Sequence, residues 1–394
     1  MRKQSGFTIV ELLIVIIVIG ILAAITIVSY VGVTQRAREA SLISDLNNNK
    51  KQLELYKTFY GYYPTGFDVN NCPSTPTPDI NRCLKFSTGN SFYYTAQGQS
   101  PQTFDLSATN DDGALEYHIT ESVAAVAVEP CPSGYIRVPG STTYGTSTFC
   151  VMKYEAKNVG GVATSVAAGV PWVSIPQTNA SSTNDATDLS AAACSGCHLI
   201  TEAEWLTIVQ NVLSVSSNWS GGAVGSGFIY SGHNDNSPAN SLAADANDTN
   251  GYAGTNNVSP SNQRRTLTLT NGEVIWDLAG NNWEWTAGAT VSGITSQPGV
   301  AGNSYVSFVE WPSVSTAGSL SPNVFPNATG ITGAGTWNSS NGIGKLRSSI
   351  THTVQQAFRR GGTYDGNADT GVFTLDLKNA PTIANAFISF RVAK

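Results

Sequence analysis

The sequence has few charged residues. Asp, Glu, Lys and Arg make up 12% of its 394 residues, about half the roughly 25% found in soluble domains. Beyond the first residues there is no run of lysine and arginine, which argues against a nucleic-acid-binding surface. Gly, Ser, Thr and Asn take the place of charge, as in many extracellular β-rich proteins. Aromatic residues are spread throughout, which excludes a disordered chain.

Clustered metal ligands are also scarce. The four histidines are scattered, at His118, His198, His233 and His352. The six cysteines fall in three close pairs, Cys72 and Cys83, Cys131 and Cys150, and Cys194 and Cys197. In an exported chain the simplest interpretation is three local disulfides. The alternative is zinc at the CxxC of residues 194–197, but neither a second CxxC nor a pair of histidines accompanies it.

The first thirty residues contain a long apolar run. Residues 7–30 hold a single charged side chain, Glu11. A helix of this length, at 1.5 Å per residue, crosses a hydrocarbon core of roughly 30 Å. Arg2 and Lys3 precede the run and no acid does. The positive-inside rule therefore predicts a single pass with the leader in the cytoplasm and the rest of the chain outside.

A secretory signal peptide and a plain membrane anchor are the two simpler interpretations. The run is long for a signal peptide and lacks a clear small-residue cleavage box. Glu11 argues against a plain anchor, because a carboxylate inside an apolar helix is costly and is a functional candidate by default.

Residues 6–13, GFTIVELL, resemble the class III prepilin signal of type IV pilins and type II secretion pseudopilins. The resemblance implies cleavage between Gly6 and Phe7 by a prepilin peptidase and N-methylation of Phe7. It also implies that the apolar segment is retained in the cytoplasmic membrane. The implied partners are other pilin subunits and an inner-membrane assembly platform, and the implied destination is a surface filament.

Glu11 has a physical role in such a filament. Cleavage would create a cationic amine at Phe7, at the depth of the carboxylate. The amine of one subunit can then pair with Glu11 of its neighbour, so that two buried charges that are costly alone become tolerable together.

The helix is predicted to continue to residue 59, because residues 31–59 contain no proline and carry apolar residues at helical spacing. Gly61 and Pro64 then break the pattern. We thus expect a leader at 1–6 and a helix at 7–59, of which 7–30 is transmembrane.

A small pilin-like β unit is predicted at 60–122. Short strand candidates, separated by turn residues, lie at 92–95, 102–108 and 114–120. Asp111-Asp112-Gly113 is typical of a hairpin turn, and calcium binding is the alternative. The proline-terminated stretch 123–130 is predicted to be a linker to a second domain, 131–394.

The second domain contains several local motifs. Thr201 and Glu204 are spaced as a helix capping box. The motifs follow in the order FCVMKYEAKN (149–158), LITEAEW (199–205), DLAGNNWEWT (277–286), RRGG (359–362) and FISFRVAK (387–394). Together they resemble the formylglycine-generating-enzyme/sulfatase-modifying-factor domain, a variant of the C-type lectin-like fold. Ser389 departs from the pattern, since the family usually has glycine there.

The chemistry of that family is not expected here. The enzymes use a cysteine pair shortly after the RGG motif to bind copper, and residues 362–373 contain no cysteine. A copper–thiolate site needs soft sulfur ligands. Because fold does not carry function, the domain is predicted to be non-catalytic, with no required cofactor.

A binding scaffold is the expected alternative. Residues 359–391 resemble the variable region of diversity-generating-retroelement proteins, which exposes diversified side chains on the same fold. Tyr, Asn, Asp and Thr suit adaptable recognition. The ligand-binding candidates are Trp283, Tyr364, Asp365, Asn367, Asp369, Thr374, Asp376 and Asn379, all but Trp283 being expected to be exposed.

The tryptophans of the central motif are expected to lie mainly in the core. Trp276 and Trp285 fit that interpretation, and Trp283 is the one expected to reach a ligand. Asn281 and Glu284 match positions that help to bind a structural calcium ion in relatives, and oxygen ligands suit that ion. Hydrogen bonding within the loop is the alternative.

The sequence therefore predicts an α+β chain. Its expected function is that of a minor pilin or pseudopilin that displays a non-catalytic, lectin-like domain toward an unknown extracellular ligand, in adhesion or target recognition. Two alternatives stay open: a membrane-tethered oxidase of the formylglycine-generating type, and a type II secretion pseudopilin that engages cargo.

Overall fold

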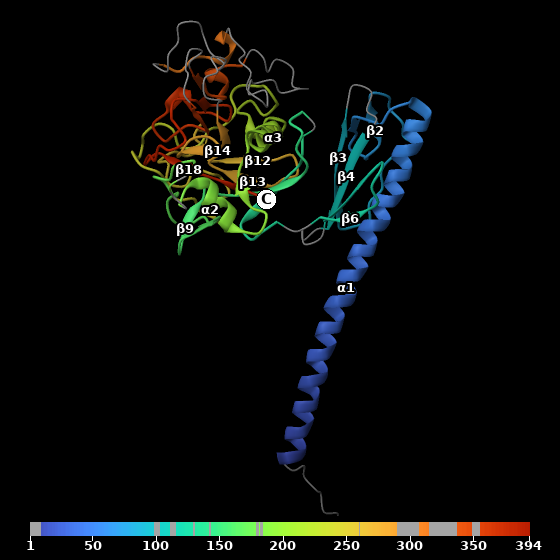
Figure 1. Cartoon of the computed structure of the whole chain (residues 1–394). Coiled ribbons are helices and arrows are strands. Elements are labelled where there is room, and N and C mark those ends of the chain that lie inside the picture. Colours follow the sequence, from blue (N-terminus) through green and yellow to red (C-terminus); the bar gives the residue numbers. More distant parts are fainter. Residues whose placement is uncertain are drawn as a thin grey trace, which may run out of the picture. The chain divides into compact units, whose positions relative to one another are not determined.

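The structure is a computed structural model that describes residues 9–97, 103–110, 116–128, 131–141, 143–178, 181, 184–259, 261–289, 307–314, 337–348 and 355–394. Side chains are not described at 9–33, 95, 97 and 289. Gly6, Phe7 and the turn at 111–113 lie outside the described residues, as does the side chain of Glu11. The chain forms two compact units, 1–130 and 131–394. Both mix helix and sheet (Figure 1), so the predicted α+β class is confirmed.

Helix α1 (Ile9–Tyr60) is the first element of unit 1. Along its C-terminal part Leu42, Leu46, Leu53 and Tyr56 are buried, and their spacing places them on one face of the helix. The helix stops at Gly61, which has a positive φ of 83° and whose N–H donates to the carbonyl of Lys57 (2.7 Å). Among the described residues, no helix combines the length and the apolar character that a membrane span requires.

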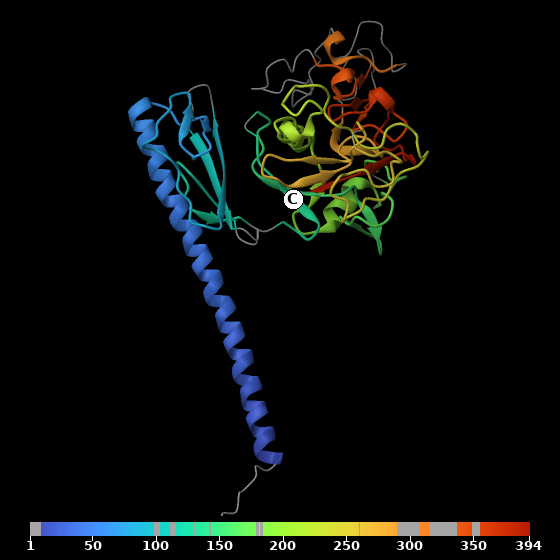
Figure 2. The same cartoon turned by 180° about the vertical axis from the view of Figure 1, so that it is seen from behind.

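An antiparallel sheet covers the buried face of α1 (Figures 1 and 2). Its strands follow chain order, β3 (Asn90–Gln97), β4 (Thr103–Asn110), β5 (Glu116–Thr120) and β6 (Val126–Ala127). Along β4, Phe104, Leu106 and Ala108 alternate with less buried residues and pack with Leu42 and Leu46. The alternation is that of a strand with one face on a core.

The fourth strand differs from the sequence prediction. Residues 123–130 were expected to be a linker, but Val126 and Ala127 pair with β5, and the N–H of Val128 donates to the carbonyl of Glu116 (2.8 Å). The exposed edge of β5 offers unpaired backbone groups, and a β-branched residue next to it readily adds a short strand.

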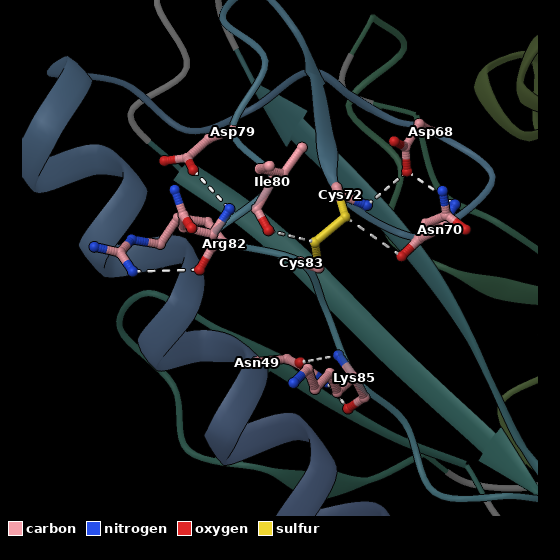
Figure 3. Close-up of a disulfide and its surroundings, with 10 residues drawn as sticks. Asn49, Asp68, Asn70, Cys72, Asp79, Ile80, Arg82, Cys83 and Lys85 are labelled. Atoms are coloured by element: carbon pink, nitrogen blue, oxygen red, sulfur yellow. Dashed lines mark hydrogen bonds between the residues drawn. A yellow bond between two sulfur atoms is a disulfide. The ribbon is translucent and has the colours of Figure 1, made fainter.

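A disulfide-bonded loop packs beside the C-terminal part of α1 (Figure 3). It carries β1 (Gly66–Phe67) and β2 (Pro73–Thr75) and contains the Cys72–Cys83 disulfide. Asp68 accepts hydrogen bonds from the N–H groups of Asn70 and Cys72. The side chain of Asn49 bonds both backbone groups of Lys85, at 2.7 and 2.8 Å. The loop is thus fixed to the helix by polar contacts as well as by the covalent bond.

Replacing Leu46 by alanine is expected to destabilise unit 1 by about 2–5 kcal/mol, because the side chain is fully buried and its loss leaves a cavity. Leu55→Ala, on the same helix, is the matched control, since Leu55 is 42% exposed, and it should change stability by no more than about 0.5 kcal/mol. Hydrogen exchange of the β4 amides measures the difference. Equal effects of the two substitutions would contradict the burial.

Unit 2 contains two main sheets (Figure 1). The first has the order β11 (His198–Leu199), β19 (Val392–Ala393), β8 (Phe149–Met152) and β7 (Tyr135–Val138). The second has the order β15 (Leu346–Arg347), β17 (Leu375–Asp376), β16 (Ala357–Arg360), β14 (Trp283–Ala289) and β18 (Ile388–Phe390). Smaller hairpins are β9 (Lys157–Val159) with β10 (Val162–Thr164), and β12 (Thr266–Thr268) with β13 (Val274–Trp276).

The two ends of unit 2 meet in the first sheet. Strand β19 pairs with β8, and the N–H of Cys150 donates to the carbonyl of Lys394 (2.8 Å). A disulfide joins Cys150 to Cys131, the first residue of the unit. The disulfide Cys194–Cys197 follows helix α2 (Ala186–Ala193). All three disulfides predicted from the spacing are therefore present.

Helix α3 (Glu202–Leu213) begins with the predicted capping box. The hydroxyl of Thr201 accepts from the N–H of Glu204, and the Glu204 carboxylate accepts from the N–H of Thr201. Trp205 follows one residue later, fully buried, and its Nε1 donates to the carbonyl of Val372 (3.0 Å). The cap thus fixes where the helix starts, and the tryptophan fixes how it packs. Trp276 and Trp285 are buried as predicted.

Buried arginines join distant parts of unit 2. Each has a buried carboxylate as its partner, and the closest N–O distances are 2.7 Å for Arg265 with Asp277, 2.5 Å for Arg360 with Glu202 and 2.7 Å for Arg391 with Glu284. Such pairs stabilise little beyond an apolar contact of similar volume, but removing one partner leaves a buried charge uncompensated.

Candidate functional site

A pocket of about 500 Å³ lies in unit 2, where the second sheet meets the loops around it. Its lining comes from three stretches of the predicted binding region, around residues 359, 363–369 and 385–387, and from residues 283, 308 and 347, which lie far from them in the sequence. We call four of the lining residues the floor of the pocket: Trp283 on β14, Phe308, Arg347 on β15 and Arg359 on β16. Its rim consists of Asp365, Asn367, Asp369, Asn385 and Phe387.

The floor alternates guanidinium groups with aromatic rings. Trp283 and Phe308 are stacked, with ring centroids 6.1 Å apart and planes inclined by 7°. The guanidinium of Arg359 lies 4.7 Å from the Trp283 ring, and that of Arg347 lies 4.4 Å from the Phe308 ring. Cations over aromatic faces attract them, more strongly where water is excluded. The four side chains therefore hold one another in place.

A single carboxylate serves both arginines of the floor. Asp376 accepts from Arg359 Nη2 (2.5 Å) and from Arg347 Nε (2.8 Å). Burial lowers the pKa of Arg359, and Asp376 opposes that shift only in part. The Nε of Arg359 is buried without a hydrogen-bond partner among the described residues. The floor thus carries two cations and an unsatisfied donor, and the buried Asp376 behind it supplies one anion.

Asp376 was expected to be exposed, and that expectation is wrong. Its side chain is fully buried, as is that of Thr374, whose hydroxyl donates to the carbonyl of Asp369 (2.6 Å). Both residues belong to the tightly packed stretch around β17. There Arg359 pairs with Asp376 across the strands, so burial follows from ion pairing rather than from an apolar pattern. Thr374 and Asp376 support the pocket instead of lining its surface.

The other candidates divide between the pocket and its surroundings. Trp283, although largely buried, lines the pocket, as do Asp365, Asn367 and Asp369. Asn367 and Asp369 are the ends of a short 3₁₀ helix, η5. Asn379 is half-buried and is not among the lining residues. Its carbonyl accepts from the N–H of Ala357 (2.8 Å).

Tyr364 lies between the pocket rim and the 231–238 loop. Its half-buried ring stacks on that of His233, with centroids 5.9 Å apart, and meets Phe387 at 5.8 Å. Desolvation raises the pKa of its hydroxyl above the ordinary value. Tyr364 therefore supports Phe387, which is 41% exposed and is the apolar member of the rim.

Asn281 and Glu284 were predicted as calcium ligands, and the structure uses both within the protein. Both carboxylate oxygens of Glu284 accept from Arg391, at 2.7 and 3.0 Å. The side chain of Asn281 accepts from the N–H of Leu242 (2.7 Å) and donates to Glu155. Burial raises the pKa of Glu155 to about 8. Both side chains thus have hydrogen-bond partners from distant segments of unit 2, rather than from within their own loop as the alternative proposed.

Sequence reasoning missed the two arginines of the floor. Arg359 and Arg360 are neighbours on β16 and must point to opposite faces of the sheet. Arg360 reaches Glu202, and Arg359 reaches the pocket. The available signal was the pair of adjacent arginines in the RRGG motif, because neighbouring side chains on a strand point to opposite faces of its sheet. Nothing local marks Arg347, which reaches the floor through the parallel pairing of β15 with β17.

Comparison with known proteins concerns the N-terminal part of the chain. A family model described as the prokaryotic N-terminal methylation motif matches residues 1–27. The type II secretion system core protein G of Vibrio cholerae is 30% identical over 124 residues, which are 29% of this chain and 84% of that protein. The corresponding protein of Aeromonas hydrophila is 32% identical over 110 residues, 25% of this chain and 77% of its own length.

A pilus protein matches as well. The type IV wide pilus major component PilA4 of Thermus thermophilus is 32% identical over 135 residues, which are 34% of this chain and 100% of that protein. These alignments therefore cover at least 77% of each relative but at most 34% of this chain.

Proposed function

The chain belongs to the family of type II secretion pseudopilins and type IV pilins, and from this premise we propose that it carries unit 2 on a filament as a non-catalytic ligand-binding module. Its similarity to known proteins supports the role of a pilin- or pseudopilin-like subunit. The proposed ligand-binding role of unit 2 rests on the observation that this unit contains a pocket with a buried, incompletely paired arginine. Such an unsatisfied polar group calls for a partner.

The assembly end of the chain is proposed to work through its first residues. The prepilin peptidase would cut between Gly6 and Phe7 and methylate the new amine. The apolar residues 7–30 would hold the subunit in the cytoplasmic membrane as a single pass, with unit 2 outside. The assembly platform would then pass it into a filament, where Glu11 meets the amine of a neighbour.

The display end is proposed to be a C-type lectin-like domain of the sulfatase-modifying-factor type. The order of motifs from 149–158 to 387–394 supports that assignment. Oxidase chemistry is not proposed, because the family's cysteine pair has no counterpart in residues 362–373. The six cysteines of the chain are all taken up in disulfides.

Truncation after Val128 tests this division of labour. The shortened chain retains all of the strands of unit 1, including β6, which pairs with β5. It is expected to enter filaments at close to the normal level but to lose all binding of the filament to its target surface. Immunogold counts of filaments and a cell-adherence assay measure the two properties. Adherence that survives truncation would refute the display role.

The relatives named for type II secretion favour a second candidate, a secretion pseudopilin that engages cargo through unit 2. The same truncated chain discriminates between the two. A secretion role predicts that exoprotein accumulates inside the cells that carry it, whereas a display role predicts normal export and lost adherence.

A further inference from the structure

Building on the proposed display function, we propose that the pocket of unit 2 binds an acidic sugar, with the sugar carboxylate on Arg347 and Arg359 and the sugar hydroxyls on the rim. The inference names the ligand class of the site described above. It rests on the charges of the floor, on the unsatisfied donors that line it and on the chemistry of the rim.

The charge of the floor favours an anion. Two guanidinium groups share the one carboxylate of Asp376, which leaves one positive charge in excess at the bottom of the pocket. Arginine presents a planar fork of donors that matches a carboxylate. Arg347 keeps 18% of its side chain exposed, so a ligand can reach it without displacing protein atoms.

Unsatisfied donors point to the same place. The Nε of Arg359 and the hydroxyl of Thr363 are buried, have no hydrogen-bond partner among the described residues, and belong to pocket-lining residues. Buried polar groups are rarely left unpaired in folded proteins. A ligand carboxylate offers the acceptor atoms that both donors lack.

The rim has the opposite character and selects against a ligand with several negative charges. Asp365 and Asp369 are acidic, and the latter is paired with Lys345 at 3.0 Å. Asn367 and Asn385 add amide groups, which both donate and accept. Hydroxyl groups also donate and accept, so carboxylate and amide side chains suit them. The exposed ring of Phe387 supplies an apolar surface beside them.

One deep carboxylate with several hydroxyls around it describes a uronic acid better than a peptide terminus, whose neighbours are amides and side chains. Methyl galacturonoside, a monosaccharide with a single carboxylate, is therefore the probe, and methyl galactoside is its matched control because the carboxylate is replaced by a hydroxymethyl group. Calorimetry on the full chain in detergent gives the affinity for each sugar. A tripeptide with a free terminal carboxylate is the third probe.

The wild-type chain is expected to bind methyl galacturonoside at least about tenfold more tightly than methyl galactoside, since a hydrogen bond to a charged group contributes about 1.5–3 kcal/mol. Arg347→Gln should abolish this preference, and Arg347→Lys should retain part of it. Asp376 keeps Arg359 as a partner in either variant, so the floor remains paired. Lys378→Gln is the control, with the same change of charge at an exposed side chain outside the pocket.

Equal affinities for the two monosaccharides, or a preference unchanged by Arg347→Gln, would overturn the inference. Binding of the tripeptide in place of the sugar, or of none of the three probes, would overturn it too. Each of these results leaves the display function standing, because that function fails only if the truncated chain adheres as well as the full chain.

Discussion

Replacing Glu11 by alanine is expected to abolish filament assembly while leaving membrane insertion intact. In the filament the carboxylate would face the N-terminal amine of a neighbouring subunit, in surroundings without water. Removing one partner of such a pair leaves the other charge buried and unpaired, at a cost of about 3–5 kcal/mol. That cost corresponds to more than a hundredfold in an association constant, and it recurs at every subunit of the filament.

Two control variants separate the loss of the Glu11 pairing from the general loss of a carboxylate and from a failure of cleavage. Glu54→Ala removes an exposed carboxylate from the same helix and should leave filament yield unchanged. Gly6→Asp should instead block cleavage, so that the uncut chain accumulates in the membrane. Electron microscopy counts the filaments, and the mass of the subunit reports cleavage. Normal filament yield from Glu11→Ala would refute the pairing.

Replacing Glu284 by glutamine is expected to destabilise unit 2 by about 3–5 kcal/mol. Burial opposes the charge on Arg391, but Glu284 more than offsets that effect, and the pKa of the guanidinium is raised. Without the carboxylate, the acceptors next to Arg391 would be the carbonyls of Met152 (2.8 Å) and Trp276 (2.9 Å) and the amide oxygen of the new glutamine, all of them uncharged. A fully buried cation would thus lose its counter-charge.

The thermal midpoint of unit 2 measures this effect. A loss of that size lowers the midpoint by roughly 6–20 °C in a unit of more than 200 residues, at about 2–4 °C per kcal/mol. Glu273→Gln is the matched control, because Glu273 is exposed and lies in the turn before β13. A fall for Glu284→Gln no larger than that for Glu273→Gln would show that the ion pair is unimportant for stability.

Local features of the fold were predictable wherever one short stretch of sequence decides them. Gly61 ends α1 because only glycine adopts its positive φ without strain. Thr201 and Glu204 cap α3 by bonds that span three residues. The cysteine pairs are close in sequence, which leaves few alternatives to local disulfides.

The pocket was predictable only in part, because distant segments build it. Trp283, Arg347 and Arg359 converge through pairings of β14, β15, β16 and β17, and no local pattern specifies such pairings. The exposure of Thr374 and Asp376 was misjudged for the same reason. Polar residues in a glycine-rich stretch are typical of a solvent-facing loop, yet one of them is a buried counter-ion of two arginines.

The Cys131–Cys150 disulfide has a mechanical consequence for a module carried on a filament. Tension transmitted through the linking segment enters unit 2 at residue 131 and passes through the covalent bond directly into β8. That strand lies between β7 and β19, inside its sheet. Residues 132–149 are therefore shielded from the load and cannot be peeled away first. A pull on the bound ligand would be resisted by an interior strand rather than by a fraying end.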